Sequence, residues 1–350
     1  MIARSVTTAV LLACSCCASL HAADETAAAD EAKSLGNIRQ VTRGFTRAGE
    51  GYFSPDGKQI VYQAYPVGYP FYQIYTQPLD KFEPRRISPG RGRTTCAFFS
   101  PDGKNILFAS AHTDPDPEKT EKAARDEAAK GGRPKYQWDF DPNMEIYVVG
   151  ADGLGMKRLT DSPGYDAEGS YSHDGKQVVF TSTRDGDPDI YVMNADGTNV
   201  RQITNVDGYD GGPFFSPDDK WIVYRTDRKA KDMLQVHVIS VDGKHDTPLT
   251  DNTDQVNWCP YFHPNGKTII WSSADYSRGP MGANFDLYAM EVTLTADSAT
   301  PGTPRRITTH AKADVLPVFS PDGKQLMWTS NRTEDGTSQL YIADWKSLPQ

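Results

Sequence analysis

The sequence has no long hydrophobic run after its first twenty residues, few cysteines and no excess of basic residues. Five cysteines in 350 residues are too few for a small disulfide-stapled scaffold. No later stretch approaches the roughly 18 consecutive apolar residues of a membrane-spanning helix. The formal net charge is −9, and Lys and Arg are scattered, whereas nucleic-acid-binding proteins usually carry a basic patch. We therefore predict a soluble globular protein with no transmembrane segment and no nucleic-acid partner.

Common catalytic and cofactor motifs are also missing. We find no G-x-S-x-G nucleophile elbow, no H-E-x-x-H metal pair, no P-loop and no dinucleotide-binding glycine fingerprint. The histidines beyond the N-terminal segment form no closely spaced ligand pair; they are His112, His173, His237, His245, His263 and His310. These absences favour a binding protein over an enzyme.

The N-terminal segment has the pattern of a secretory signal. Arg4 is followed by an apolar run to about Leu20 and then by small residues. We predict a signal peptide at 1–22, followed at 23–37 by a tether or a short helix. A lipoprotein signal is the alternative, because Leu-Leu-Ala precedes Cys14, which would then carry a lipid anchor. Both interpretations predict a periplasmic or secreted protein.

A turn phrase, Ser-Pro-Asp-Gly-Lys or a close variant, recurs six times, beginning at residues 54, 100, 172, 216, 263 and 320. The base spacing is about 45 residues, the length of one four-stranded propeller blade. An aromatic residue precedes every turn, and another follows eight positions after the turn begins. The apolar segments between these aromatic residues are typical of buried strands.

The number of strands predicts how the ring closes. A third strand follows each of the six turns, but a fourth strand ending in Thr or Ser follows only five. The missing fourth strand is found at the other end of the chain, at 38–42. We therefore predict an all-β, six-bladed β-propeller over 38–346. Its four-stranded blades form a ring closed by the N-terminal strand, which completes the last blade and removes exposed sheet edges.

Two insertions interrupt the repeats. The longer one, 112–143, contains EKTEKAARDEAAK, which is rich in helix formers and ends before Gly131-Gly132. It predicts a charged helix over one surface. The shorter one, 293–304, predicts a flexible loop.

Four aromatic residues do not belong to the repeating core positions. They are Tyr69 and Phe71 in blade 1, and Trp138 and Phe140 in the longer insertion. Exposed aromatic residues can anchor a protein partner. The alternative is that they pack the insertion against neighbouring blades.

Acidic and amide side chains occupy equivalent places before several turns. Asp166, Asp210, Asn257 and Asp314 each lie six residues before a turn, and Glu168 lies four before. Innermost strands surround the propeller axis, so these five residues are candidates for a ring that binds a ligand or a cation. The alternative is that each Asp caps its own loop through nearby backbone amides.

Alternate acids in RDGDPDIY resemble the start of a calcium-binding loop. They are Asp185, Asp187 and Asp189, but the later bidentate Glu of such loops is absent. A plain turn between strands is the alternative. We therefore expect no cofactor, with Ca²⁺ as the one candidate.

The sixfold repeat resembles the TolB-like propeller family of the bacterial envelope over residues 38–345. The resemblance implies the fold and an envelope location. The chain departs from TolB itself, which carries a sizeable α/β domain before its propeller. It also has no segment that could form the catalytic domain of prolyl-oligopeptidase-type relatives. We expect a non-catalytic binding or scaffold protein for a protein or peptide partner in the cell envelope. The alternative is a hydrolase or lyase that uses carboxylates at the channel mouth.

Overall fold

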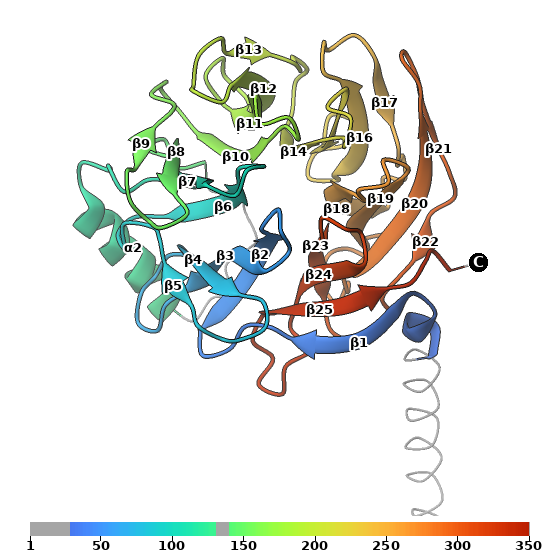
Figure 1. Ribbon diagram of the computed structural model, residues 1–350, viewed down its shortest axis with the longest axis horizontal. Coiled ribbons are helices and arrows are strands. Elements are labelled where there is room, and N and C mark those ends of the chain that lie inside the picture. The colour runs from blue at the N-terminus through green and yellow to red at the C-terminus, as the bar shows by residue number, and fades with distance from the viewer. Residues whose placement is uncertain (1–28, 131–139, 350) are drawn as a thin grey trace, which may run out of the picture.

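The structure is a computed structural model that describes residues 29–130 and 140–349, and its strands form six sheets around one axis (Figure 1). The predicted signal peptide, Cys14 and Trp138 lie outside the described residues. The all-β, six-bladed architecture is confirmed. The first strand of each blade lies innermost; in blades 1 to 6 these strands are β2 (Arg47–Phe53), β6 (Thr94–Phe99), β10 (Asp166–Tyr171), β14 (Asp210–Phe215), β18 (Gln255–Phe262) and β23 (Asp314–Phe319).

Second and third strands pair outward from the axis in antiparallel order. The second strands are β3 (Gln59–Tyr65), β7 (Asn105–Ser110), β11 (Gln177–Ser182), β15 (Trp221–Thr226), β19 (Thr268–Asp275) and β24 (Gln325–Ser330). The third strands are β4 (Gln73–Pro78), β8 (Glu145–Gly150), β12 (Asp189–Asn194), β16 (Gln235–Ser240), β20 (Asp286–Leu294) and β25 (Gln339–Trp345). The outer strands of blades 1 to 5 are β5 (Arg85–Arg86), β9 (Lys157–Arg158), β13 (Arg201–Gln202), β17 (Asp246–Pro248) and β22 (Arg305–Arg306).

The N-terminal strand closes the ring, as the number of strands predicted. Strand β1 (Leu35–Gln40) pairs with β25 as the outer strand of blade 6. It begins three residues earlier than the predicted 38–42, and Val41 N–H still bonds Leu340 O at 2.7 Å. Residues 29–34, expected to be a tether or a short helix, are helical.

The recurring turn is held by its own side chains. In the first copy, the Ser54 hydroxyl donates to Asp56 at 2.7 Å and accepts from Gln59 N–H at 2.9 Å. Gly57 has a φ of +69°, a left-handed conformation that favours glycine. The turn phrase is therefore an architectural element of the blade.

Each Thr or Ser that ends an outer strand ties that strand to the third strand. Thr204 Oγ1 accepts from Ile190 N–H at 2.9 Å and donates to Asp189 at 2.7 Å. The backbone N–H of the third strand is bonded in the same way by Thr42, Ser88, Thr160, Thr250 and Thr308.

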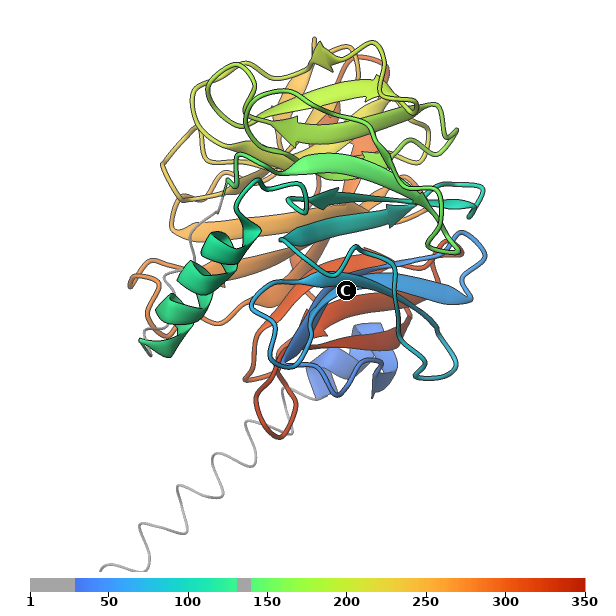
Figure 2. The same ribbon diagram turned by 90° about the vertical axis from the view of Figure 1, so that its left-hand side faces the viewer.

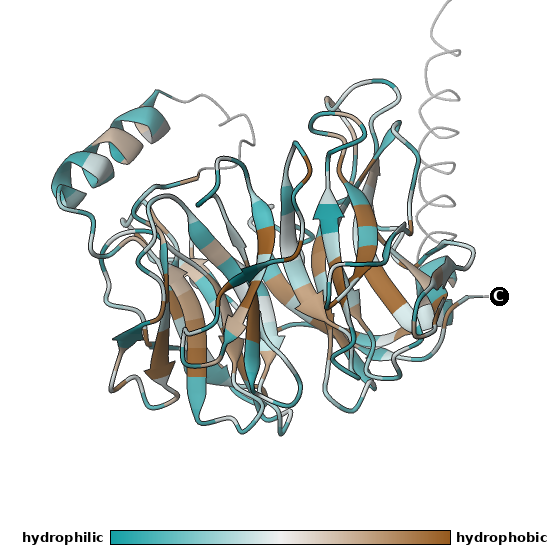
Figure 3. Ribbon diagram, turned by 90° about the horizontal axis from the view of Figure 1, so that it is seen from above, coloured by the Kyte–Doolittle hydropathy of each residue, from teal (hydrophilic) through white to brown (hydrophobic). Residues whose placement is uncertain are grey.

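Aromatic residues of the second strands fill the space between blades. The positions eight after the turn are almost completely buried; they are Tyr62, Phe108, Phe180, Tyr224, Trp271 and Trp328. Figure 3 shows the hydrophobic segments concentrated in the strands, with hydrophilic loops at both ends.

The longer insertion contains the predicted helix. Helix α2 (Pro117–Ala129) stands out from the ring at one side (Figures 2 and 3). The shorter insertion differs from the prediction of a loop, because β20 continues to Leu294 and pairs with an added strand, β21 (Ala299–Pro301). Within the described ranges, none of the helices is long and apolar enough to cross a membrane.

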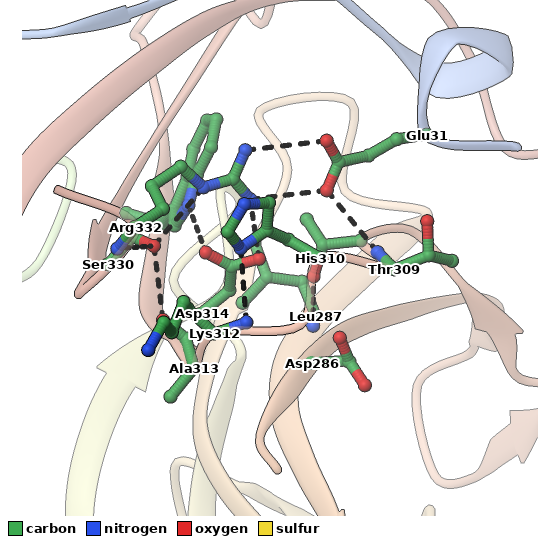
Figure 4. A network of polar contacts seen from close by, with 12 residues as sticks. Glu31, Asp286, Leu287, Thr309, His310, Lys312, Ala313, Asp314, Ser330 and Arg332 are labelled. Carbon is green, nitrogen blue, oxygen red and sulfur yellow. Dashed lines mark hydrogen bonds and ion pairs between the residues drawn. The ribbon is translucent and has the colours of Figure 1, made fainter. Parts of the chain in front are cut away.

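A buried ion-pair network fastens the N-terminal segment to blade 6 (Figure 4). The Arg332 guanidinium lies 2.6 Å from Asp314 and 3.1 Å from Glu31. Glu31 also accepts from Thr309 N–H at 3.3 Å. One arginine therefore joins the helical segment at 29–34 to the innermost strand of the last blade.

We predict that Arg332→Gln destabilises the protein more than Glu31→Gln does. The first change leaves two buried carboxylates without their cation, which costs about 3–5 kcal/mol. The second leaves the pair with Asp314 intact and costs on the order of 1 kcal/mol. Urea unfolding followed by circular dichroism measures both free energies of unfolding. Equal losses of unfolding free energy in the two variants would contradict the conclusion that Arg332 neutralises both Asp314 and Glu31.

The burial of Asp189 should make the free energy of unfolding depend on pH. Burial raises the pKa of Asp189 to about 7. An acid with a higher pKa in the folded chain binds more protons when folded, so the free energy of unfolding falls as pH rises from about 4 to about 7. Asp189→Asn removes this dependence. Its melting temperature relative to wild type should therefore be higher at about pH 8 than at about pH 5. The matched control is the surface substitution Asp161→Asn, and the difference in melting temperature between the two variants should change from one pH to the other.

Candidate functional site

A cavity of about 1680 Å³ lies within the ring of innermost strands. Its lining comes from these strands, from the loop between β3 and β4, and from one side of α2. The longer insertion and the off-pattern hairpin of blade 1 therefore contribute to the same cavity as the strands around the axis.

One position of every innermost strand lines this cavity, the position four residues before the turn. Its occupants are Glu50, Cys96, Glu168, Gly212, Cys259 and Leu316. All six have a left-handed φ between 45° and 60°, and the pairing of the first two strands shifts register at each of them. These are β-bulges, which re-aim a side chain at the cost of one ladder pairing.

Aromatic rings form the floor of the cavity. Tyr52, Phe214 and Tyr261 line the cavity, and Phe98 packs against Tyr52 without lining it. All four lie two residues before a turn. The Tyr52 ring lies 5.8 Å from Phe214 and 5.1 Å from Phe98, and the Phe214 ring lies 4.9 Å from Tyr261. Since Tyr52 and Phe214 come from opposite blades, their contact spans the axis. The rings fill the centre of the propeller at this level.

The acids six residues before the turns do not line the cavity. Asp166 pairs with Arg184 at 3.0 Å, Asp210 with Arg228 at 2.7 Å, and Asp314 with Arg332. Each arginine belongs to the same blade as its acid. The expected ring of cation-binding carboxylates is replaced by separate ion pairs that support the loops, because the arginines already neutralise the acids.

Asn257 has the same supporting role in blade 5. Its side-chain oxygen accepts from Trp271 Nε1 at 2.9 Å, and its amide donates to Gln235 at 3.1 Å. The sequence contained a signal for this arrangement. The three blades with Asp six before the turn are also the three blades with Arg twelve after the turn begins.

Glu168 does line the cavity, but its carboxylate is fully engaged. It pairs with Arg225 at 3.1 Å and accepts from Gly212 N–H at 2.6 Å. The hydroxyls of Tyr209 and Thr181 also donate to it, at 2.9 and 3.0 Å. Glu168 therefore holds Arg225 in place and has little capacity left for a ligand.

Glu50 is the other carboxyl group in the ring of bulge positions, and it is placed differently. It is half-buried, and no ion pair among residues 29–130 and 140–349 includes it. The Tyr52 hydroxyl lies 3.4 Å from its Oε1. Burial raises the pKa of Glu50, and the negative charge of Glu168 raises it further. The predicted ring of acids lay mostly six residues before the turn, whereas the side chains that line the cavity lie four before it.

Both described cysteines, Cys96 and Cys259, are free thiols in the same ring of bulges. Burial raises the pKa of each thiol well above its ordinary value, so the thiolate is disfavoured.

Three of the four off-pattern aromatic residues line the cavity: Tyr69, Phe71 and Phe140. The Tyr69 hydroxyl donates to Glu121 of α2 at 2.6 Å. Phe140 packs against Tyr165 at 5.2 Å and is 37% exposed. These residues both hold the insertion down and form part of the cavity wall.

The acidic turn of blade 3 lies away from the cavity lining. Oxygens of Asp185, Asp187 and Asp189 lie within 4.8 Å of one another. Gln202 Nε2 donates to Asp185 and Asp189, and Gly208 N–H donates to Asp187. The calcium hypothesis for this turn stays a prediction.

Glycine at 212 is required by the arrangement of Arg225. A Cβ atom there would lie 1.9 Å from Arg225 Nη1. We predict that Gly212→Ala destabilises the protein by more than the roughly 1–2 kcal/mol of left-handed strain, because Arg225 must also move. Gly155→Ala is the matched control, since Gly155 has a φ of +70° and nothing within 4 Å. If both variants lost the same free energy of unfolding in urea, a clash between the new Cβ atom and Arg225 would be contradicted.

Comparisons with known proteins agree with this fold. The family model of the TolB beta propeller domain matches residues 138–293. Over 45 residues the chain is 47% identical to the Tol-Pal system protein TolB of Bordetella pertussis, covering 13% of this chain and only 10% of that protein. TolB from Acinetobacter baumannii has a TM-score of 0.54 at 18% identity, over 87% of this chain and 64% of that chain. Oligogalacturonate lyase from Vibrio parahaemolyticus has a TM-score of 0.54 at 13% identity, over 88% of this chain and 93% of that chain. The match of the TolB beta propeller domain model, together with these relatives, supports a TolB-like propeller family for this chain.

Proposed function

We propose that this protein is a non-catalytic binding propeller whose cavity receives a segment of a protein or peptide partner. The observation that carries the proposal is the cavity itself: it is large, its floor is closed by aromatic rings, and aromatic side chains line its wall. Concave sites with mostly apolar walls and a few polar groups are typical of ligand binding. Tyr and Trp are also the residues that most often anchor protein interfaces.

The charges of the cavity favour binding over catalysis. Glu168 is bonded to Arg225, and Arg93 lies 3.2 Å from Asp141. Paired acid–base catalysis needs two carboxyl groups free to exchange protons at one substrate. Glu50 is available in the cavity, and Glu168 is held by four partners.

The envelope is the proposed location. The signal-like N-terminal segment supports it, and so does the similarity to Tol-Pal system proteins. The partner would then be another protein of the periplasm or of a membrane facing it.

A lyase or hydrolase is the second candidate. It is favoured by the raised pKa of Glu50, which suits a general acid or base, and by the shared fold with an oligogalacturonate lyase. The test is whether wild type releases unsaturated sugars or cleaved peptides. If it does, and Glu50→Gln does not, the result supports an enzyme over a binding protein.

Filling the cavity mouth tests the binding function. Ala124 of α2 lines the cavity, whereas Ala129 of the same helix does not. We expect the tagged protein to capture a partner from an envelope extract. Ala124→Trp should reduce this capture about tenfold or more, since displacing an anchor from a desolvated pocket costs 2 kcal/mol or more. Ala129→Trp should capture as wild type does. Equal capture by both variants would contradict binding in the cavity.

A further inference from the structure

Two charged side chains of strand β2 face the cavity without an ion-pair partner among the described residues: Arg47 and Glu50. Elsewhere on the cavity wall, Glu168 pairs with Arg225 and Arg93 with Asp141. The buried Asp114 makes no ion pair, but it accepts from Asp116 N–H and from the Thr120 hydroxyl. The Glu50 carboxyl is hydrogen-bonded by Tyr52 and Cys96 and attracted by the charge of Arg225, but it makes no ion pair with a cation of its own. The partner segment can supply that cation.

The surroundings of Glu50 suit a cation on a long apolar stem. Tyr52 donates to Glu50 from below, and its ring belongs to the aromatic floor with Phe214 and Tyr261. Trp258 and Tyr72 line the same cavity. The faces of such rings attract ammonium and guanidinium groups, and their surfaces pack well against the methylenes of Lys or Arg.

The closed floor limits how a ligand can enter. Because Tyr52 and Phe214 meet across the axis, a chain cannot thread through the propeller at that level. A ligand that reaches Glu50 must therefore end there or project a side chain there. The net charge of −9 also attracts a basic segment over a distance.

The geometry points to Glu50 as the receptor for a lysine or arginine side chain that the partner segment inserts to the aromatic floor. This inference rests on the proposed binding function and names the chemistry that its ligand must carry. Arg47 lies at the outer end of the same strand, with its guanidinium 5.5 Å from the centre of the Tyr65 ring. It has the opposite charge in the same cavity and supplies the matched control.

The test uses the full chain and two probes of similar size, N-acetyl-lysine amide and the uncharged N-acetyl-norleucine amide. Ligand-detected NMR measures their affinity for wild type, Glu50→Gln and Arg47→Gln. We expect wild type to prefer the lysine probe. Glu50→Gln should weaken that probe about tenfold or more, the loss of a hydrogen-bonded charge, while Arg47→Gln should not weaken it.

Folding of the variant can be checked independently. Glutamine preserves the shape of Glu50 and removes a buried acid, so the melting temperature of Glu50→Gln should equal or exceed that of wild type. Equal affinity for the two probes, undetectable binding of the lysine probe, or an unchanged lysine affinity in Glu50→Gln would each overturn the inference.

Capture experiments separate this inference from the function on which it rests. If Ala124→Trp loses the partner and Glu50→Gln retains it fully, segment binding stands and recognition of a basic side chain is overturned. If Glu50→Gln loses the lysine probe as expected while Ala124→Trp captures as wild type does, the cation site stands and segment binding in the cavity is overturned.

Discussion

The left-handed residue at the bulge of every innermost strand is the constraint on which the cavity depends. A regular strand of the same length would turn alternate side chains into the spaces between blades. The bulge inserts one extra residue into the strand. The six residues at the bulges all have a left-handed φ, and all line the cavity around the axis. Because all six blades share this backbone, the composition of the ring varies freely: two acids, two thiols, one glycine and one leucine occupy the same geometry. The blades supply the shape, and the bulge residues supply the chemistry.

The distribution of charge follows from the same geometry. Buried acids six residues before the turn are compensated inside their own blades, and Asp314 shares Arg332 with Glu31 at the point where the ring is closed. Such pairs cost desolvation energy and contribute mainly when both partners are present. These carboxylates therefore support the loops of their own blades and do not line the cavity. Among the described residues of the innermost strands, Glu50 and Arg47 line the cavity without an ion pair, and both belong to blade 1.

The repeats made the architecture predictable. A spacing of about 45 residues, the buried aromatic positions and the missing fourth strand together predicted six blades and their closure. The site was less predictable, because bulges depend on backbone conformation and leave no fixed residue type in the sequence. Glu50, Cys96 and Leu316 share a φ and a position but no side-chain chemistry. The strand formed at Ala299–Pro301 was missed for a related reason, since its pairing depends on an extended β20 and not on its own composition.

Blade 1 and the insertion of blade 2 differ most from the shared pattern, and they form one wall of the cavity. Tyr69 bonds Glu121 of α2, Phe71 lies under Arg93, and Phe140 reaches Tyr165. An insertion in one blade does not change the packing of the other blades. One blade can therefore carry a specific site while the remaining blades keep the propeller rigid. The asymmetry of charge around Glu50 is then the expected result of specialisation in one repeat, because equivalent places elsewhere hold a thiol, a leucine, a glycine or an acid already paired with Arg225.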